Sequence, residues 1–475
     1  MKYGIHNSKN NGGNLAIYAQ STGEHMGKLT CKGGDYQAGI GGNDNETGGA
    51  LLIAGGNIEA RGGMDAAGIG GGEDGDSGFI NICGGRVSAY GKQGGSGIGG
   101  GEGGRGGYIN ISGGEITAKG GYFGYTCGGA GIGGGKRGTG GEILIEGGTV
   151  HATGGIDASG IGGGEEGDGG LIEIKGGNVE AYGQHNAAGI GGGQYGRGGT
   201  IVIDNGEIEA YSSNNFDGGT FTAGGAGIGG GEDRDGGDIT INGGRIYAKA
   251  GTDNCDFGAG IGGGDEGDGG HIVINGGEIE SVGSDNGAGI GGGNYGNGGH
   301  IEINGGIINA HGPVDSNGHR YGFGAGIGGG DGASGGETTI NGGNVYSYGS
   351  ACCGLSASGA GAGIGGGSTG SSGTITINNG YVEVFAPRDI DEFNGDVMQG
   401  AGIGAGYEGK TDAIAINGGN VWALGYEAVG ASSKGKACNT VTLADGMKVN
   451  GFSYEDRYKA LRTENKWISI AMDLG

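Results

Sequence analysis

The sequence predicts an all-β fold, a right-handed parallel β-helix of about thirteen rungs with three short strands in each rung and a C-terminal cap. Three observations predict it. The motif Ala-Gly-Ile-Gly-Gly-Gly, with close variants, recurs twelve times, most often at a spacing of 29 residues. Between its copies, apolar and polar residues alternate with the period of two that is typical of β-strands. The chain of 475 residues contains 143 glycines and only 2 prolines, far outside globular usage.

The glycine content alone would also suit two other classes of protein, and the sequence pattern excludes both. Collagen needs glycine at every third residue and abundant proline, and this chain has neither. A disordered glycine-rich chain lacks apolar residues at fixed places, whereas isoleucine and valine recur here at the same positions in every unit. A stacked repeat remains, because each unit can then bury its apolar residues against its neighbours.

Each unit contains three strand segments in a fixed order. The first segment, Ile-x-Ile, supplies two inward ladders of branched side chains, as in Ile109 and Ile111. The second pairs a branched residue with a small one, as in Val179 and Ala181, which suits a narrow interior. The isoleucine of the glycine motif forms the third wall. We expect residues 1–430 to form the parallel β-helix repeat domain, and residues 431–475 to form the last rung and C-terminal cap.

Asparagine stands directly after the Ile-x-Ile strand in six consecutive rungs. Asparagine tolerates the left-handed turn before Gly-Gly, and its amide can donate to one rung while it accepts from another. We therefore expect an asparagine ladder at a corner of the solenoid rather than a ligand site. The residues are Asn242, Asn275, Asn304, Asn341, Asn378 and Asn417.

The charge balance excludes two classes of partner. The formal net charge of −26 comes from 52 acidic against 26 basic residues, which argues against nucleic acid and against anionic membranes. No apolar run approaches the roughly 20 residues needed to span a bilayer, so we expect no membrane insertion. The first residues lack the apolar core of a signal peptide. This predicts either an intracellular chain or an excised part of a larger one.

The repeat resembles a known kind of surface protein. The pattern Gly-x-Ile-x-Ile-x-Gly-Gly-x-Val-x-Ala, with Ala-Gly-Ile-Gly-Gly-Gly, is similar to the glycine-rich β-helix repeat region of large secreted or wall-attached surface proteins of Gram-positive gut bacteria. The stretch from Asp445 to Val449, followed by Asp456 and Arg457, also resembles the way those regions close. The likeness covers almost the whole chain. From the sequence we expect neither the signal peptide nor the wall anchor of those proteins within these residues. The likeness implies extracellular or cell-surface display and contact with carbohydrate.

Exposed aromatic residues are the first candidates for a binding surface. Some form an expected outward column at the end of the second strand of each rung, and others lie in insertions that collect at one corner. Rings beside a flat sheet can stack on sugar rings, and the alternative is that they pack the longer loops onto the solenoid. The candidates for polysaccharide or glycan binding are Tyr90, Tyr182, Tyr211, Tyr348 and Phe385 in the column, and Tyr122, Phe123, Tyr125, Tyr321 and Phe323 in the insertions.

Acidic clusters follow several copies of the glycine motif. Stacking places residues 73–76 near Arg105 and residues 165–168 near Lys136, Arg137 and Arg197, so cross-rung ion pairs are expected there. Two further clusters occupy neighbouring rungs with only one arginine between their charges, and oxygen-rich loops of this kind can hold calcium. The candidate metal ligands are Glu232, Asp233, Asp235, Asp265, Glu266 and Asp268. The pattern requires no cofactor, and calcium is the candidate cation.

A pair of carboxylates is the candidate catalytic group. Glu180 and Glu209 occupy the same outward slot on consecutive rungs, with Glu173 on the neighbouring strand. The spacing of adjacent strands is close to the roughly 5 Å that separates the carboxylates of a retaining glycosidase. The alternative is outward glutamate on a solvated strand, since glutamate recurs in this slot elsewhere. The histidines are dispersed, and only His271 and His300 share a slot on successive rungs.

These observations predict a non-enzymatic function and leave an enzymatic one as the alternative. We expect a non-enzymatic extracellular surface solenoid that is adhesin-like or glycan-binding, or that serves as a structural stalk. The alternative is a polysaccharide-cleaving enzyme, a glycosidase or a lyase, on the same β-helix scaffold. Repeat motifs specify the fold rather than the ligand, so the residues that differ between the repeats must carry the function.

Overall fold

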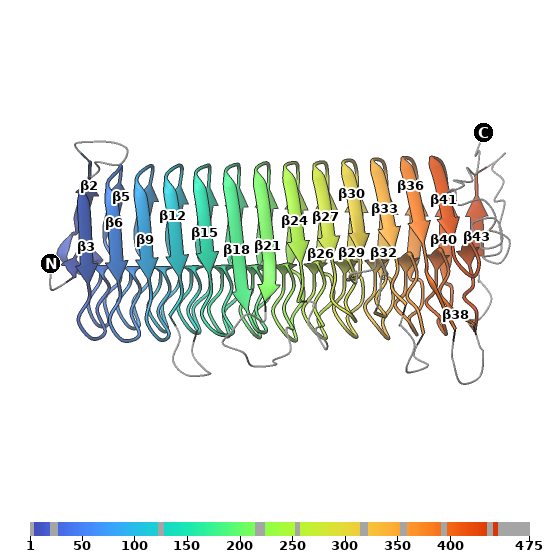
Figure 1. Ribbon diagram of the computed structural model, residues 1–475, viewed down its shortest axis with the longest axis horizontal. Helices are drawn as coiled ribbons and strands as arrows, with labels where there is room; N and C mark the ends of the chain where they lie inside the picture. Colours follow the sequence, from blue (N-terminus) through green and yellow to red (C-terminus); the bar gives the residue numbers. More distant parts are fainter. Residues whose placement is uncertain are drawn as a thin grey trace. The chain divides into compact units, whose positions relative to one another are not determined.

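The computed structural model describes residues 4–19, 27–121, 128–213, 224–251, 257–313, 322–351, 359–390, 397–434 and 440–444. The chain divides into two compact units, Met1–Gly251 and Thr252–Gly475. In each unit the described residues form a parallel β-solenoid with three parallel sheets, so the predicted fold class is confirmed. The strands of one sheet follow each other in chain order and lie side by side within each unit (Figure 1).

The first unit begins with strand β1 (Ile5–His6) and the short 3-10 helix η1 (Lys9–Asn11), and then repeats three strands per turn. The first sheet contains β1 and the strands of the glycine motifs: β4 (Ile40–Gly41), β7 (Ile69–Gly70), β10 (Ile98–Gly99), β13 (Ile132–Gly133), β16 (Ile161–Gly162), β19 (Ile190–Gly191) and β22 (Ile228–Gly229). The Ile-x-Ile segments form the second sheet: β2 (Asn14–Ile17), β5 (Ala50–Ile53), β8 (Phe79–Ile82), β11 (Tyr108–Ile111), β14 (Glu142–Ile145), β17 (Leu171–Ile174), β20 (Thr200–Ile203) and β23 (Asp238–Ile241). The third sheet contains β3 (Lys28–Lys32), β6 (Asn57–Arg61), β9 (Arg86–Tyr90), β12 (Glu115–Lys119), β15 (Thr149–Thr153), β18 (Asn178–Gln184), β21 (Glu207–Ser213) and β24 (Arg245–Lys249).

The second unit repeats the same order. Its first sheet contains β25 (Ile261–Gly262), β28 (Ile290–Gly291), β31 (Ile327–Gly328), β34 (Ile364–Gly365), β39 (Ile403–Gly404) and β42 (Val429–Gly430). Its second sheet contains β26 (His271–Ile274), β29 (His300–Ile303), β32 (Glu337–Ile340), β35 (Thr374–Ile377), β40 (Ala413–Ile416) and β43 (Thr440–Leu443). Its third sheet contains β27 (Glu278–Val282), β30 (Ile307–His311), β33 (Asn344–Tyr348), β36 (Tyr381–Phe385) and β41 (Asn420–Leu424). An antiparallel pair, β37 (Arg388–Ile390) and β38 (Val397–Gln399), is inserted between β36 and β39.

The C-terminal residues divide between described and undescribed parts. Strand β43 pairs in parallel with β40, so the predicted last rung contributes a strand to the second sheet. The predicted cap, residues 446–475 of the predicted 431–475 region, lies outside the described residues.

The core consists of the inward side chains that the period-two pattern predicts. In one turn, Ile172, Ile174, Val179, Ala181 and Ile190 are each 0% exposed. Full burial of a side chain such as isoleucine contributes about 1.5–3 kcal/mol relative to exposure. The interior is therefore dry and narrow, and the variable outward residues are left to carry function.

The register between turns places like residues opposite each other. Ile172 lies opposite Ile143 on one side and Ile201 on the other, so this inward position continues as isoleucine from turn to turn. Thr338 is an exception in the second unit, where it occupies an isoleucine slot at 1% exposure. Its hydroxyl has no hydrogen-bond partner among the described residues, which makes this turn locally weaker.

The asparagines after the second-sheet strands form the predicted ladder. In the second unit, the side-chain amide of Asn304 donates to Asn275 at 2.9 Å, and Asn341 donates to Asn304 at 2.8 Å. The chain of bonds continues from Asn378 to Asn341 and from Asn417 to Asn378, each at 2.8 Å. In the first unit, Asn242 donates to Asp204 at 2.8 Å. The structural interpretation of these residues is confirmed.

Candidate functional site

The outer face of the third sheet gathers the candidate side chains of the first unit. Because successive residues of a strand point to opposite faces, the third and fifth residues of β15, β18, β21 and β24 all point outward. The third residues are His151, Glu180, Glu209 and Tyr247, which lie opposite one another in consecutive strands. The fifth residues are Thr153, Tyr182, Tyr211 and Lys249. The parallel register thus turns dispersed sequence positions into one surface cluster.

The tyrosines of this cluster stack on each other. The ring centroids of Tyr182 and Tyr211 lie 4.9 Å apart, with an angle of 7° between the ring planes. Tyr247 meets the Tyr211 ring at 5.6 Å and 53°. The facing surfaces of Tyr182 and Tyr211 therefore cover each other. The structure joins two predicted residues but arranges them poorly for stacking on a sugar.

The candidate catalytic carboxylates already have partners. Nδ1 of His151 lies 2.8 Å from Oε2 of Glu180, and the Tyr211 hydroxyl donates to Oε2 of Glu209 at 2.6 Å. Burial, together with the hydrogen bond to Glu209, raises the pKa of Tyr211 well above its usual range, so the phenol remains a neutral donor. Glu173 lies on the second sheet, where Lys175 lies 3.3 Å from its Oε2 atom. Glu180 and Glu209 are brought together, and Glu173 lies in a different sheet.

A second aromatic cluster covers the third sheet of the second unit. The rings of Tyr346 and Tyr381 lie 5.8 Å apart at 52°, and those of Tyr381 and Trp422 lie 6.4 Å apart at 45°. Tyr348 and Phe385, both predicted, lie opposite each other at the ends of β33 and β36. All five side chains are half-buried. Because the rings of Tyr346, Tyr381 and Trp422 are tilted rather than stacked, they do not cover each other face to face.

Three residues of this cluster were not among the candidates predicted from the sequence: Tyr346, Tyr381 and Trp422. The predicted column contains only the last outward position of each strand, whereas Tyr381 stands at the first position and the other two at the third. The sequence does indicate this cluster when all three outward positions of each strand are compared across neighbouring turns. The three strand sequences are Asn-Val-Tyr-Ser-Tyr, Tyr-Val-Glu-Val-Phe and Asn-Val-Trp-Ala-Leu.

Of the other aromatic residues predicted from the sequence, those that the structure describes do not belong to either aromatic cluster, and they differ in their surroundings. Tyr90 is isolated from the other tyrosines of the column, and the Arg61 guanidinium lies over its ring at 4.3 Å. Phe323 is half-exposed, and its backbone joins the stack of turns by accepting from Ser368 N at 2.8 Å. Tyr122, Phe123, Tyr125 and Tyr321 lie outside the described residues.

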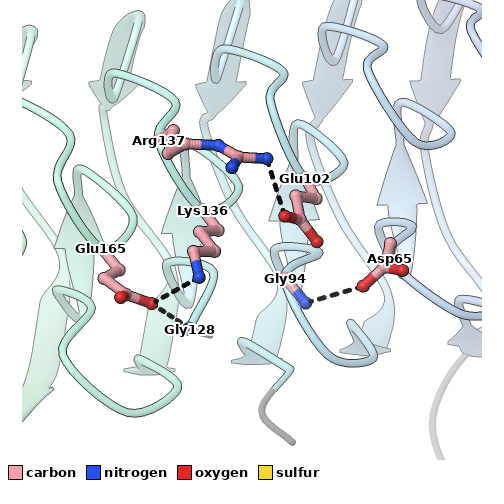
Figure 2. Close-up of polar contacts among 7 residues, drawn as sticks. All are labelled: Asp65, Gly94, Glu102, Gly128, Lys136, Arg137 and Glu165. Carbon is pink, nitrogen blue, oxygen red and sulfur yellow. Dashed lines mark hydrogen bonds and ion pairs between the residues drawn. The ribbon is translucent and has the colours of Figure 1, made fainter. Parts of the chain in front are cut away.

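One turn precedes each strand of the first sheet and another turn follows it. The preceding turns stack into one column and the following turns into a second column, and hydrogen bonds join the two columns. The backbone N–H of Lys136 donates to Gly94 O at 2.7 Å, and that of Glu165 donates to Gly128 O at 3.0 Å. We call the line between the two columns the turn seam. Figure 2 shows its side chains in the first unit: Asp65, Glu102, Lys136, Arg137 and Glu165.

Ion pairs join successive copies of the turn that follows the glycine motif, as the sequence predicts, with one addition. Lys136 Nζ lies 3.5 Å from Glu165 Oε2, and Arg105 Nε lies 3.8 Å from Asp76 Oδ1. Arg137 lies 2.7 Å from Glu102, a partner that the pattern did not predict (Figure 2). Burial, followed by the hydrogen bond and charge of Asp65, raises the pKa of Glu102 against the opposing charges of Arg137 and Lys136.

Three of the candidate calcium ligands, Glu232, Asp265 and Asp268, accept hydrogen bonds through their carboxylates within their own units. In the first unit, Gln194 Nε2 donates to Glu232 at 2.5 Å, and Arg234 donates to the backbone carbonyls of Tyr195 and Asp233, both at 2.9 Å. In the second unit, Asn294 donates to Asp265 at 3.0 Å, and the Asn297 backbone donates to Asp268 at 2.7 Å. Asp235 and Glu266 complete the two predicted groups. Calcium binding here stays a prediction.

The described part of the chain contains no group of three or more His, Cys, Asp or Glu side chains arranged to hold a metal ion. It also contains no helix long and apolar enough to cross a membrane.

Comparison with protein families finds the beta helix repeat in eight stretches of the chain. The matched residues are 52–73, 80–102, 109–136, 143–165, 172–194, 239–265, 272–294 and 301–331. Comparison with curated proteins and with solved structures finds no match. The family match supports a β-helix repeat region, and its stretches end in the turn that follows each glycine motif. The functional assignment must come from the outward side chains.

Proposed function

We propose that this chain is a non-enzymatic surface solenoid that binds a polysaccharide or glycan through the outer face of the third sheet. The cluster of Tyr346, Tyr381 and Trp422 carries the proposal, because three half-buried aromatic rings lie together on one sheet and are tilted, so that they do not cover each other face to face. Pyranose rings present apolar C–H faces that stack on such platforms, while hydroxyl groups at the sugar rim bind nearby polar side chains.

Polar groups with fixed directions surround these rings. The Tyr381 hydroxyl donates to Glu383 Oε2 at 2.9 Å, and burial together with this bond raises the pKa of Tyr381 to about 12. The phenol therefore stays neutral near pH 7, and Glu383 retains a second oxygen that can accept from a sugar hydroxyl. The net charge of −26 disfavours an acidic polysaccharide. We assign a neutral glycan as the ligand class.

Surface display belongs to the same proposal. The resemblance to secreted or wall-attached surface proteins of Gram-positive gut bacteria supports an extracellular or cell-surface location and an adhesin-like role. A structural stalk would need the stacked turns but not the aromatic cluster. Loss of glycan binding when the cluster is removed therefore distinguishes a glycan-binding solenoid from a stalk.

The binding proposal predicts a loss of affinity when the cluster is truncated. Tyr381→Ala and Trp422→Ala are each expected to weaken binding to a neutral glycan about fivefold to thirtyfold, the equivalent of roughly 1–2 kcal/mol for a lost aromatic contact. Tyr182→Ala and Tyr211→Ala are expected to have smaller effects, because those rings cover each other. A glycan array identifies the ligand, and titration calorimetry measures the change.

The matched control is Tyr108→Ala. Tyr108 stacks on Phe79 at 4.6 Å on the second sheet of the first unit, outside the proposed surface, and its removal is expected to leave the affinity unchanged. An array without binding above background, or equal affinity of the Tyr381 and Trp422 variants and the wild type, would refute the glycan assignment.

A polysaccharide-cleaving enzyme is the second candidate function. It is favoured by Glu180 and Glu209, which lie directly opposite on adjacent strands and each bind a titratable partner. If the cluster is catalytic, purified protein will release reducing ends or unsaturated products from a polysaccharide, with or without calcium, and Glu180→Gln will abolish the release. Our proposal expects no product in either assay.

A further inference from the structure

Two histidines and a glutamate occupy one outward row on the second sheet of the second unit. His271, His300 and Glu337 are the first residues of β26, β29 and β32, and the register places each opposite the next. The centroids of the two imidazole rings lie 5.2 Å apart, with 37° between the ring planes. His271 and Glu337 are exposed and His300 is half-exposed, so solvent reaches the row. Neither the glycan proposal nor the candidate calcium ligands use these residues.

The glutamate orients one of the imidazoles. His300 Nδ1 lies 3.1 Å from Glu337 Oε2, and an ionised carboxylate can only accept, so Nδ1 carries the hydrogen. The Nε2 atom of a neutral His300 then keeps its lone pair. This carboxylate–histidine arrangement is the outer-shell contact that metal-binding histidines almost always have, because it fixes the tautomer and makes the ligating nitrogen more basic.

We propose that His271 and His300 together bind a transition-metal ion of the Zn²⁺, Ni²⁺ and Cu²⁺ class, with Glu337 orienting His300. Imidazole nitrogens suit these ions, whereas calcium prefers oxygen ligands. Two nitrogens bound to a tetrahedral ion at roughly 2.0–2.1 Å lie about 3.4 Å apart. Adjacent strands are about 4.8 Å apart, so converging rotations of the two rings bring their nitrogens to that separation.

The ion would have two protein ligands. Since no three His, Cys, Asp or Glu side chains of the described residues are arranged around a common point, water completes the coordination shell. Such a site is open on the solvent side, where an additional ligand from a bound molecule can replace water.

The test is titration of the full chain with ZnCl₂, measured by calorimetry on folded protein whose accessible thiols have been blocked by alkylation. His271→Ala and His300→Ala are each expected to weaken Zn²⁺ binding at least about tenfold, and the double variant is expected to remove the binding event. Glu337→Gln is expected to weaken binding about tenfold or more, the usual consequence of losing an outer-shell partner. Thermal melting without metal is expected to be unchanged in all variants, because the three side chains lie outside the core.

His151→Ala is the matched control. His151 makes the same kind of contact, with Nδ1 2.8 Å from Glu180, but the residues opposite it are Thr117 and Glu180, so it has no second imidazole beside it. Its removal is expected to leave Zn²⁺ affinity unchanged. The proposal is overturned if the wild type binds no more Zn²⁺ than the double variant, or if the His151 variant loses as much affinity as the His300 variant.

Discussion

Gly162→Ala is expected to lower the free energy of unfolding by more than about 3 kcal/mol. Gly162 has a φ of +132°, a conformation that is essentially restricted to glycine. A Cβ atom there would lie 2.1 Å from the carbonyl oxygen of Gly191 in the next turn. The same oxygen accepts the Gly163 N–H at 2.9 Å, so relief of the overlap would also break the contact between turns. Urea denaturation followed by far-UV circular dichroism measures the loss.

Gly12→Ala separates this steric effect from the backbone preference. Gly12 also has a positive φ, +62°, but no atom lies within 4 Å of a Cβ placed on it. Its replacement is expected to cost about 1–2 kcal/mol, the penalty of the left-handed conformation alone. If Gly162→Ala and Gly12→Ala lower the free energy of unfolding equally, then close contact with the carbonyl of the next turn is not what requires glycine in the motif.

Asp157→Asn is expected to stabilise the protein at pH 8 and to have little effect near pH 3. Burial and the charges of Glu165 and Glu232 raise the pKa of Asp157 from 3.8 to about 7, against hydrogen bonds from Asn186 that lower it. The folded chain therefore holds this proton between about pH 4 and pH 7, where the unfolded chain has released it. By linkage, the wild type loses stability as pH rises through this window, and above it the loss is on the order of 4 kcal/mol.

Asp157→Asn is expected to remove this pH dependence of stability without straining the backbone. Asp157 has a φ of +59°, and asparagine tolerates this left-handed conformation as well as aspartate does. Denaturation of both proteins from pH 3 to pH 8 is the measurement. Parallel stability curves for variant and wild type would contradict the assignment, since the difference between them must grow as the pH rises.

The fold could be predicted because each local signal agrees with the stacked arrangement. The alternation around Ile172 and Val179 defines the inward faces, and the repeat spacing sets the register between turns. The asparagine ladder could be predicted for the same reason. A residue that recurs at one place in consecutive turns lies next to the equivalent residue of the neighbouring turn.

The candidate site was predicted only in part, because it depends on side-chain conformation. The sequence placed Tyr182 and Tyr211 together but contains no information on whether their rings stack or tilt, and the 7° angle between the planes decides how much ring surface is open. Likewise, Arg137 can extend towards either neighbouring turn, and its contact with Glu102 depends on the local packing of the turn seam.

The one-to-one register between turns has a consequence for how such a chain can change during evolution. Ile172 and Ile201 occupy equivalent slots, so recombination that removes residues 172–200 would join Leu171 to Ile201 and restore the same strand pattern. Gain or loss of a whole copy therefore preserves the pairing of the turns that remain. Pairs such as His271 and His300 exist only because two particular copies are adjacent. Unequal exchange between repeats can thus create or separate a surface site while the interior keeps its packing.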